Sequence, residues 1–97
     1  TSLAIIGTDM PAYELNHQLT EAGYHIALHV NQEPWNHKTL FNDSELRYAI
    51  ELPELIRKHN IQAIFGWDDA LTTHCQHIIA KAKMTQQCPC LCGDDAH

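Results

Sequence analysis

Two short apolar runs, separated by one helical pattern, constrain what the first third of the chain can fold into. The first run covers residues 3–6 and leads into Gly7 and a polar turn. Apolar residues then recur at helical spacing as far as Gly23, and a second apolar run occupies residues 25–30. A strand, a tight turn, a helix and a second strand, in this order, are the parts of a parallel β-α-β unit. The pattern therefore predicts an α/β domain.

The expected ends of the first helix are marked by residues that suit them. Thr8 or Asp9 can cap its N-terminus, and Pro11 fits its first turn, where a missing N–H costs nothing. Gly23 supplies a left-handed C-terminal cap. Residues 24–30 follow as a strand in which apolar residues alternate with histidine and alanine, so we expect this strand to be less buried and near an edge of the sheet.

Two helical segments are expected in the middle of the chain. Asp43 or Ser44 can cap a short helix through residues 46–50, and Pro53 restarts a helix. That second helix ends at Asn60, after a basic last turn that suits the negative end of a helix dipole.

A third strand, residues 61–66, and a last helix complete the pattern. Asp68 or Asp69 can cap this helix. Its apolar stripe, with Cys75 expected in the core, consists of Leu71, Cys75, Ile78 and Ala82. Strands joined by helices pair in parallel through right-handed crossovers. The strand orders 2-1-3 and 3-2-1 both remain open, so either the first or the second strand can be central.

Together these elements predict a small three-layer, Rossmann-like α/β domain with a three-stranded parallel sheet over residues 1–84. Residues 85–97 are expected to form a cysteine-containing C-terminal tail, because no helical or strand pattern continues there. A chain of 97 residues suits a single domain.

Charge and cysteine usage exclude several classes of partner. The formal net charge is −6 and only six residues are Lys or Arg, which does not suit phosphate backbones or anionic membrane surfaces. No run approaches the roughly 18 apolar residues of a membrane span. Three of the four cysteines lie within residues 88–92, whereas a secreted disulfide scaffold spreads its cysteines along the chain. We therefore expect a cytoplasmic protein that binds neither nucleic acid nor membrane.

The carboxyl ends of parallel strands meet at one edge of a sheet, where open α/β folds bind their ligands. The candidate ligand-binding residues at this edge are Gly7, Thr8, Asp9, Gly66, Trp67, Asp68 and Asp69. Their three carboxylates repel a bare phosphate but suit ribose hydroxyls, an amine or a Mg²⁺-bound nucleotide. We therefore expect a small-molecule ligand here. In the alternative interpretation the aspartates only cap helices, and Trp67 packs at the edge of the sheet.

The dinucleotide fingerprint G-x-G-x-x-G is absent after the first predicted strand. Only Gly7 is present, and Asp9 and Met10 stand where a pyrophosphate would need small residues. This disfavours NAD binding in the usual manner. Neither a phosphate-binding loop motif nor a nucleophile-elbow motif occurs, so no catalytic residue is assigned.

The opening of the chain resembles that of folate-dependent formyltransferases. Residues 6–12, 19–26 and 30–34 carry the resemblance: a Gly-Thr turn after a strand, a helix ending in Glu-Ala-Gly, and a strand ending near Gln and Pro. The catalytic Asn, His and Asp of that family lie beyond the matching stretch. The resemblance implies the N-terminal, binding portion of a formyltransferase-like enzyme with a folate as ligand.

A second stretch resembles the N-terminal domain that precedes an ATP-grasp fold. It comprises residues 60–66, Asp68, Asp69 and the helix that follows them. In that family a strand, an acidic turn and a helix flank the substrate. This resemblance implies the N-terminal, binding portion of a ligase that handles a nucleotide.

A function of another class, a metal- or redox-responsive module, is the alternative. His74 and His77 can share one face of the last predicted helix, and Cys88, Cys90 and Cys92 follow them. Imidazole and thiolate suit zinc, and copper(I) tolerates the C-x-C-x-C spacing better. The simpler interpretation is a pair of solvated histidines beside a loose tail.

Two further expectations concern the surface. The other histidines, among them His29, have no second ligand at a suitable spacing and are expected to be exposed. A three-stranded sheet also has two open edges, and pairing across one of them would form a homodimer.

Overall fold

The computed structural model describes residues 2–32, 44–82 and 90–92, which form nine helices and strands. In chain order these are β1 (Ser2–Ile6), α1 (Met10–Glu21), β2 (His25–Asn31), β3 (Glu45–Tyr48), the 3₁₀ helix η1 (Ala49–Glu51), α2 (Leu52–His59), β4 (Ile61–Gly66), α3 (Ala70–Lys81) and β5 (Cys90–Cys92). No helix within these described ranges is long and apolar enough to cross a membrane.

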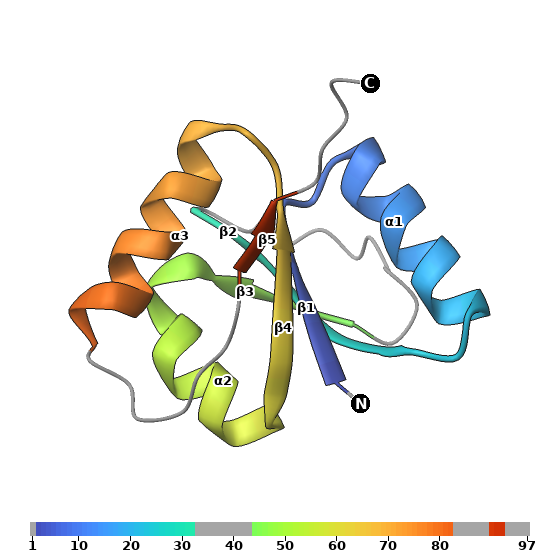
Figure 1. Ribbon diagram of the computed structural model, residues 1–97, viewed down its shortest axis with the longest axis horizontal. Coiled ribbons are helices and arrows are strands. Elements are labelled where there is room, and N and C mark those ends of the chain that lie inside the picture. Colours follow the sequence, from blue (N-terminus) through green and yellow to red (C-terminus); the bar gives the residue numbers. More distant parts are fainter. Residues whose placement is uncertain (1, 33–43, 83–89, 93–97) are drawn as a thin grey trace.

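The five strands all run parallel in one sheet, in the spatial order β3-β2-β1-β4-β5 (Figure 1). This confirms the predicted α/β class and parallel pairing. The order with the first strand in the middle is the correct one, because β1 pairs with β2 on one side and with β4 on the other. Two strands that the sequence did not predict, β3 and β5, lie at the two edges.

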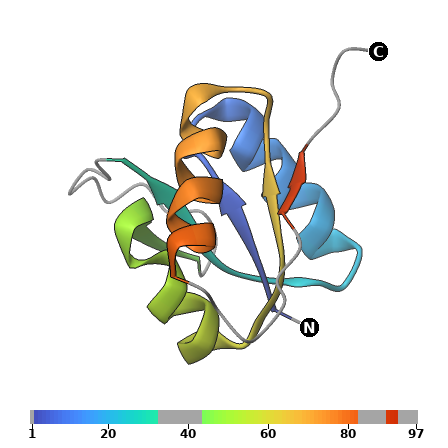
Figure 2. The same ribbon diagram turned by 60° about the vertical axis from the view of Figure 1, so that its left-hand side comes forward.

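Helices cover both faces of the sheet, as Figures 1 and 2 show. On one face α1 packs through a cluster that contains Ala12 and Ile5. On the other face α2 and α3 enclose a larger cluster that contains Ile6, Leu28 and Cys75. Successive residues of a strand point to opposite faces, so Ile5 and Ile6 serve different layers. The three-layer architecture and the buried position of Cys75 are both confirmed.

The helix ends follow the predicted caps. A carboxylate oxygen of Asp9 accepts a hydrogen bond from the backbone N–H of Ala12 at 3.4 Å, and Asp69 accepts one from the N–H of Thr72 at 2.8 Å. Asn60 ends α2 in the left-handed conformation, with φ at 54°. These caps supply partners for backbone groups that a helix terminus leaves without one.

The prediction of a helix through residues 46–50 is wrong. Residues 45–48 form β3 instead, and only the short η1 precedes α2. The outer edge of β2 carries backbone groups that need partners, and β3 satisfies them in a parallel ladder. Ser44 does not cap a helix, because its hydroxyl donates to the carbonyl oxygen of Ile26 at 2.6 Å.

The prediction that the second strand is less buried and near an edge is also wrong. Every residue of β2 from Ile26 to Val30 is buried. The reason is that β3 covers the edge of β2 that the sequence left open, while α1 covers Ile26 and His29 on one face and the α2–α3 side covers Ala27, Leu28 and Val30.

The strand β5 lies within the segment that was expected to be a tail. It pairs with the end of β4, from Ile64 opposite Cys90 to Gly66 opposite Cys92. A three-residue strand carries too little periodicity to be recognised from sequence.

Candidate ligand site at the carboxyl ends of the strands

The ends of β1 and β4 form the point at which the strand order of the sheet reverses. The chain leaves β1 toward α1 on one face and leaves β4 toward α3 on the other face (Figure 2). In open α/β sheets the crevice at such a point is the usual ligand position. The predicted candidate residues lie on the two turns that border it.

The turn after β1 is joined to the end of β2. The backbone N–H of Gly7 donates to the carbonyl oxygen of Val30 at 2.7 Å, and Asn31 donates to the hydroxyl of Thr8 at 2.8 Å. Gly7 has a φ of 112°, a backbone conformation that residues other than glycine rarely adopt. This rigid turn places Asp9 at the N-terminus of α1.

The turn after β4 is held by the first turn of α3. The backbone N–H of Trp67 donates to the hydroxyl of Thr72 at 2.8 Å, and the N–H of Thr72 donates to Asp69. Gly66 permits this close packing, since a side chain there would collide with Thr72. Asp68 is exposed and has no hydrogen bond or ion pair with another residue of the described ranges.

The two turns meet at Gly7 and Trp67. A Cβ placed on Gly7 would lie 3.9 Å from the indole Nε1 of Trp67, so the indole ring lies against the β1 turn. This Nε1 is buried, and within the described part of the chain it has no hydrogen-bond partner. A buried indole N–H normally has a partner. The meeting point of the two turns therefore holds a donor that has no partner among the described residues.

Carboxylates dominate the charge at this edge. Asp9, Asp68 and Asp69 are all exposed there, and two of them already cap helices. The interpretation of Asp9 and Asp69 as caps is therefore correct, whatever else they do. A carboxylate at the N-terminus of each helix opposes a free phosphate at the same position. The arrangement favours hydroxyl, amine or metal-bound groups of a ligand.

The prediction that His29 is exposed is wrong. The buried imidazole of His29 instead contacts the backbone of the β1 turn. This side chain is completely buried, and its Nδ1 lies 2.9 Å from the carbonyl oxygen of Gly7. Its Nε2 lies 2.7 Å from the amide nitrogen of Asn16. Because that amide donates, Nε2 accepts and Nδ1 carries the proton. The feature of the sequence that could have indicated a buried partner for His29 is Asn16, a polar residue among the inward-facing positions of the first helix.

A hydrogen-bonded network extends from His29 into three elements. The amide of Asn16 also donates to the hydroxyl of Ser44 at 3.0 Å, and the hydroxyl of Thr20 donates to the carbonyl of Asn16 at 3.0 Å. Ser44 in turn donates to the backbone of β2. The network therefore ties α1, β2 and the start of β3 to the Gly7 turn.

Acidification is expected to reduce stability through His29. Burial lowers the pKa of His29 below its ordinary value of 6.5, although its hydrogen bond to Gly7 and the charge of Asp9 oppose this. The unfolded chain therefore binds a proton at this position first. The stability contributed by neutral His29 is complete above about pH 6.5 and is lost as the pH falls toward the folded pKa.

Urea unfolding of wild type and His29→Gln as a function of pH measures this effect. At neutral pH the variant should be less stable by about 1–3 kcal/mol, because a buried hydrogen-bonded group is changed. The difference should shrink on acidification, since only the wild type loses the histidine contribution. His17→Gln, which removes an exposed imidazole, is the control. A difference that stays constant with pH would contradict the prediction.

The predicted metal-binding residues are only partly within the described ranges. His74 and His77 lie on the exposed side of α3, and among the described residues no group of three or more His, Cys, Asp and Glu could hold a metal ion. Cys88 and the side chains of Cys90 and Cys92 lie outside the description. The zinc or copper site therefore stays a prediction.

Comparison with known proteins identifies the architecture. No family model and no curated protein matches the chain. Among solved structures, UDP-D-quinovosamine 4-dehydrogenase from Vibrio fischeri superposes with a TM-score of 0.68 at 19% identity, covering 91% of this chain and 75% of that chain. RSP, a Rex-family repressor, gives 0.69 at 12% identity over 97% of this chain and 46% of its own. RSP in complex with β-NADH gives 0.69 at 11% identity over 96% of this chain and 53% of its own.

At these identities the likeness concerns the fold. The chain spans about half the length of the repressor and three quarters of the dehydrogenase. The strand order and the covering helices agree with this likeness. The chain therefore has a Rossmann-like α/β fold.

Proposed function

We propose that the protein binds a small molecule of the nucleoside or nucleotide type in the crevice between the ends of β1 and β4. The observation that carries this proposal is the meeting of Gly7 and Trp67 at the point where the strand order reverses. A backbone without a side chain and a buried indole N–H without a described partner lie side by side there. Such a pair suits a flat ring that needs close approach and one hydrogen-bond donor.

The charges of the site support a particular orientation of the ligand. Asp9 follows β1 and Asp68 follows β4, and both are exposed carboxylates that suit the hydroxyls of a ribose. A diphosphate on the N-terminus of α1 would meet the capping carboxylate of Asp9. We therefore infer that the sugar or base occupies the crevice, and that any phosphate extends outward or is bound through Mg²⁺.

The comparisons support a nucleotide-type ligand without identifying it. One of the similar structures is a complex with β-NADH, although this chain lacks the usual dinucleotide fingerprint. The resemblance of the opening stretch favours a folate, and the second resemblance favours a nucleotide. A role as the N-terminal part of a formyltransferase-like enzyme or a ligase is the finer form of this proposal, with no catalytic residue assigned.

Binding is expected to depend on the indole N–H and on the acidic edge. NADH, ATP with Mg²⁺, adenosine and folate would be titrated by isothermal calorimetry against wild type, Trp67→Phe, Asp9→Asn and Asp68→Asn. For the ligand that binds, Trp67→Phe removes one hydrogen bond and should weaken binding about three- to tenfold. Loss of one carboxylate should weaken it about tenfold or more, because hydrogen bonds to charged groups are stronger.

The variants are chosen so that folding is preserved. Asn also serves as an N-cap, so Asp9→Asn keeps the start of α1. Glu54→Gln removes an exposed carboxylate from α2 and should leave affinity unchanged. Absence of binding by all four ligands, or binding that the three site variants leave unchanged, would overturn the proposal.

A further inference from the structure

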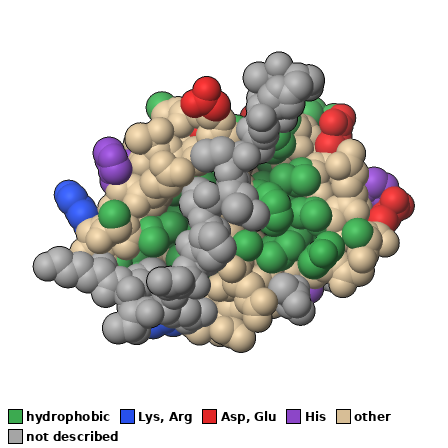
Figure 3. Space-filling view, viewed as in Figure 1, with side chains coloured by type: hydrophobic (Ala, Val, Ile, Leu, Met, Phe, Trp, Pro, Cys, Tyr) green, Lys and Arg blue, Asp and Glu red, His purple; other side chains and the backbone are tan. Residues whose placement is uncertain are grey.

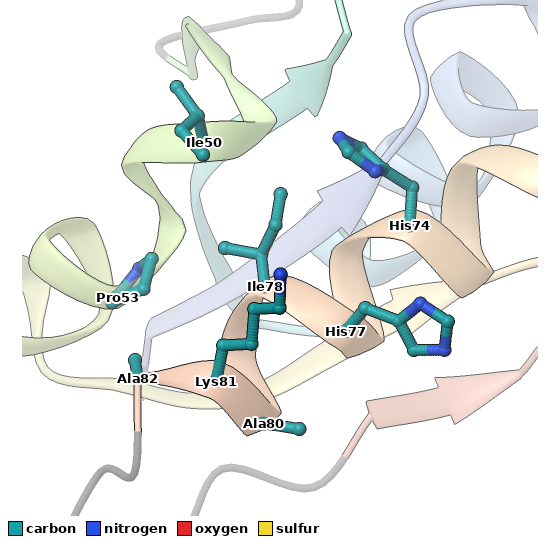
Figure 4. Close-up of a pocket in the computed structure, with 8 residues that line it drawn as sticks. All are labelled: Ile50, Pro53, His74, His77, Ile78, Ala80, Lys81 and Ala82. Carbon is teal, nitrogen blue, oxygen red and sulfur yellow. The ribbon is translucent and has the colours of Figure 1, made fainter.

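A concave surface lies away from the strand ends, between α3 and the segment formed by η1 and α2. We call it the α2–α3 groove; its volume is about 650 Å³, and it is lined by Ile50, Pro53, His74, His77, Ile78, Ala80, Lys81 and Ala82 (Figure 4). Ile50 is 70% exposed, which is unusual for a large aliphatic side chain beside other apolar groups. The floor of the groove is therefore apolar and uncovered by the described residues.

The rim of the groove is basic or titratable. His74, His77 and Lys81 follow one another at positions i, i+3 and i+7 along α3. The described Lys and Arg residues all lie in β3, α2 and α3: Arg47, Arg57, Lys58 and Lys81. Arg47 is already paired with Glu45 and Glu51. The described lining residues of the groove itself include Lys81 and no carboxylate, so a partner for the groove should combine apolar and acidic groups.

The outer side of α1 has that combination. Its solvent-facing stripe runs at helical spacing and comprises Met10, Tyr13, Glu14, His17 and Glu21. Met10 is 64% exposed and Tyr13 is 40% exposed. Residues 2–32 contain three acidic residues and no Lys or Arg. In the view of Figure 3 the visible Lys and Arg side chains lie toward the α2–α3 side, whereas acidic side chains lie both on the α1 side and above the start of α3.

We propose that the α2–α3 groove receives the outer side of α1 from a second copy of this chain. Apolar contact between Met10 and the floor at Ile50 would be reinforced by attraction between Glu14 and the rim at Lys81. The helix and the groove lie on opposite faces of the sheet (Figures 1 and 2). The contact is therefore head to tail, and each added copy presents a fresh groove or a fresh helix.

The proposal is independent of the ligand proposed above, and sedimentation velocity tests it. Wild type should gain mass progressively as protein concentration rises, and added salt should reduce this gain because the contact is partly electrostatic. Met10→Lys and Ile50→Lys each disable one side of the contact and should each stay monomeric. Both positions are highly exposed, so the fold should be unaffected, as circular dichroism would verify.

An equimolar mixture of the two variants gives the sharpest result. The groove of Met10→Lys and the helix of Ile50→Lys are both intact, so the mixture should form a complex that stops at a heterodimer. Lys81→Ser should weaken wild-type association, whereas Lys58→Ser, which also removes a cation from the last turn of a helix, should not.

Three results would overturn the proposal. Wild type could remain monomeric at every concentration, which would leave the groove to a different polypeptide. Self-association could survive both single variants, which would indicate pairing through an open edge of the sheet. A mixture that stays monomeric while wild type associates would exclude the head-to-tail arrangement.

Discussion

Gly66→Ala should destabilise the protein by about 2–3 kcal/mol, because the new methyl group has no space. A Cβ at this position would lie 2.7 Å from Cγ2 and 2.8 Å from Oγ1 of Thr72, and 3.1 Å from Cδ1 of Ile6. Thr72 cannot easily rotate away, since its hydroxyl accepts from the backbone of Trp67 and its N–H donates to Asp69. The substitution therefore strains the contact between β4, β1 and α3 at the proposed site.

Urea denaturation of Gly66→Ala and of a double variant with Thr72→Ser would measure this strain. Serine keeps the hydroxyl and removes Cγ2, so the double variant should recover part of the lost free energy. Gly23→Ala is the matched control: Gly23 has a φ of 100° but nothing within 4 Å of its Cβ position. Gly23→Ala should lower the free energy of unfolding by about 1–2 kcal/mol, because alanine disfavours this left-handed backbone conformation and no steric clash is added. A Gly66→Ala loss no larger than that of Gly23→Ala would contradict the steric argument.

Asn16→Ala should lower the free energy of unfolding by about 2–3 kcal/mol. The amide of Asn16 faces Nε2 of His29 at 2.7 Å and Ser44 at 3.0 Å, and its oxygen accepts from Thr20. Alanine at position 16 removes the amide N–H that donates to Nε2 of His29, so this buried ring nitrogen loses that hydrogen bond. Losing a partner in a buried network costs more than the hydrogen bond itself contributes.

Thermal or urea unfolding at neutral pH gives the size of this effect, and a second variant identifies its cause. Thr20 is at the exposed end of the network, so Thr20→Ala should cost much less than Asn16→Ala. Similar losses in the two variants would contradict a dominant contribution from the buried contact with His29, since alanine raises helix propensity at both positions.

Features encoded locally could be predicted from the sequence. The caps Asp9, Asp69 and Asn60 act on backbone groups a few residues away, so residue type and position identified Asn60 and narrowed each N-cap to two neighbouring residues. The same holds for the first strand and for Cys75, which follow from periodicity.

Features that depend on distant partners could not be predicted in this way. Residues 45–48 become a strand only because β2 offers an edge to pair with. His29 is buried because β3 covers that edge and because Asn16 lies opposite it on α1. The alternation of apolar residues with histidine and alanine is typical of a surface strand. No property of residues 24–30 alone indicates that this strand is buried.

The same distinction between local and tertiary information applies to the candidate site. Gly7 and Gly66 could be identified as strand-end glycines, and Trp67 as the residue after the third predicted strand. Their meeting depends on β1 and β4 being adjacent, which the sequence left open between two strand orders. The buried support from His29 belongs to the same tertiary information.

The central position of β1 has a consequence for how the chain is made. Ser2 pairs with Ile61, so β1 has to wait for nearly sixty further residues to leave the ribosome before its second neighbour exists. Until then Ile6 and Leu28 present to solvent the apolar face that α2 and α3 later cover. Such long-range pairing makes folding slow and exposes intermediates to aggregation. Nascent chains that stop before β4 should therefore be the species that chaperones bind and proteases remove.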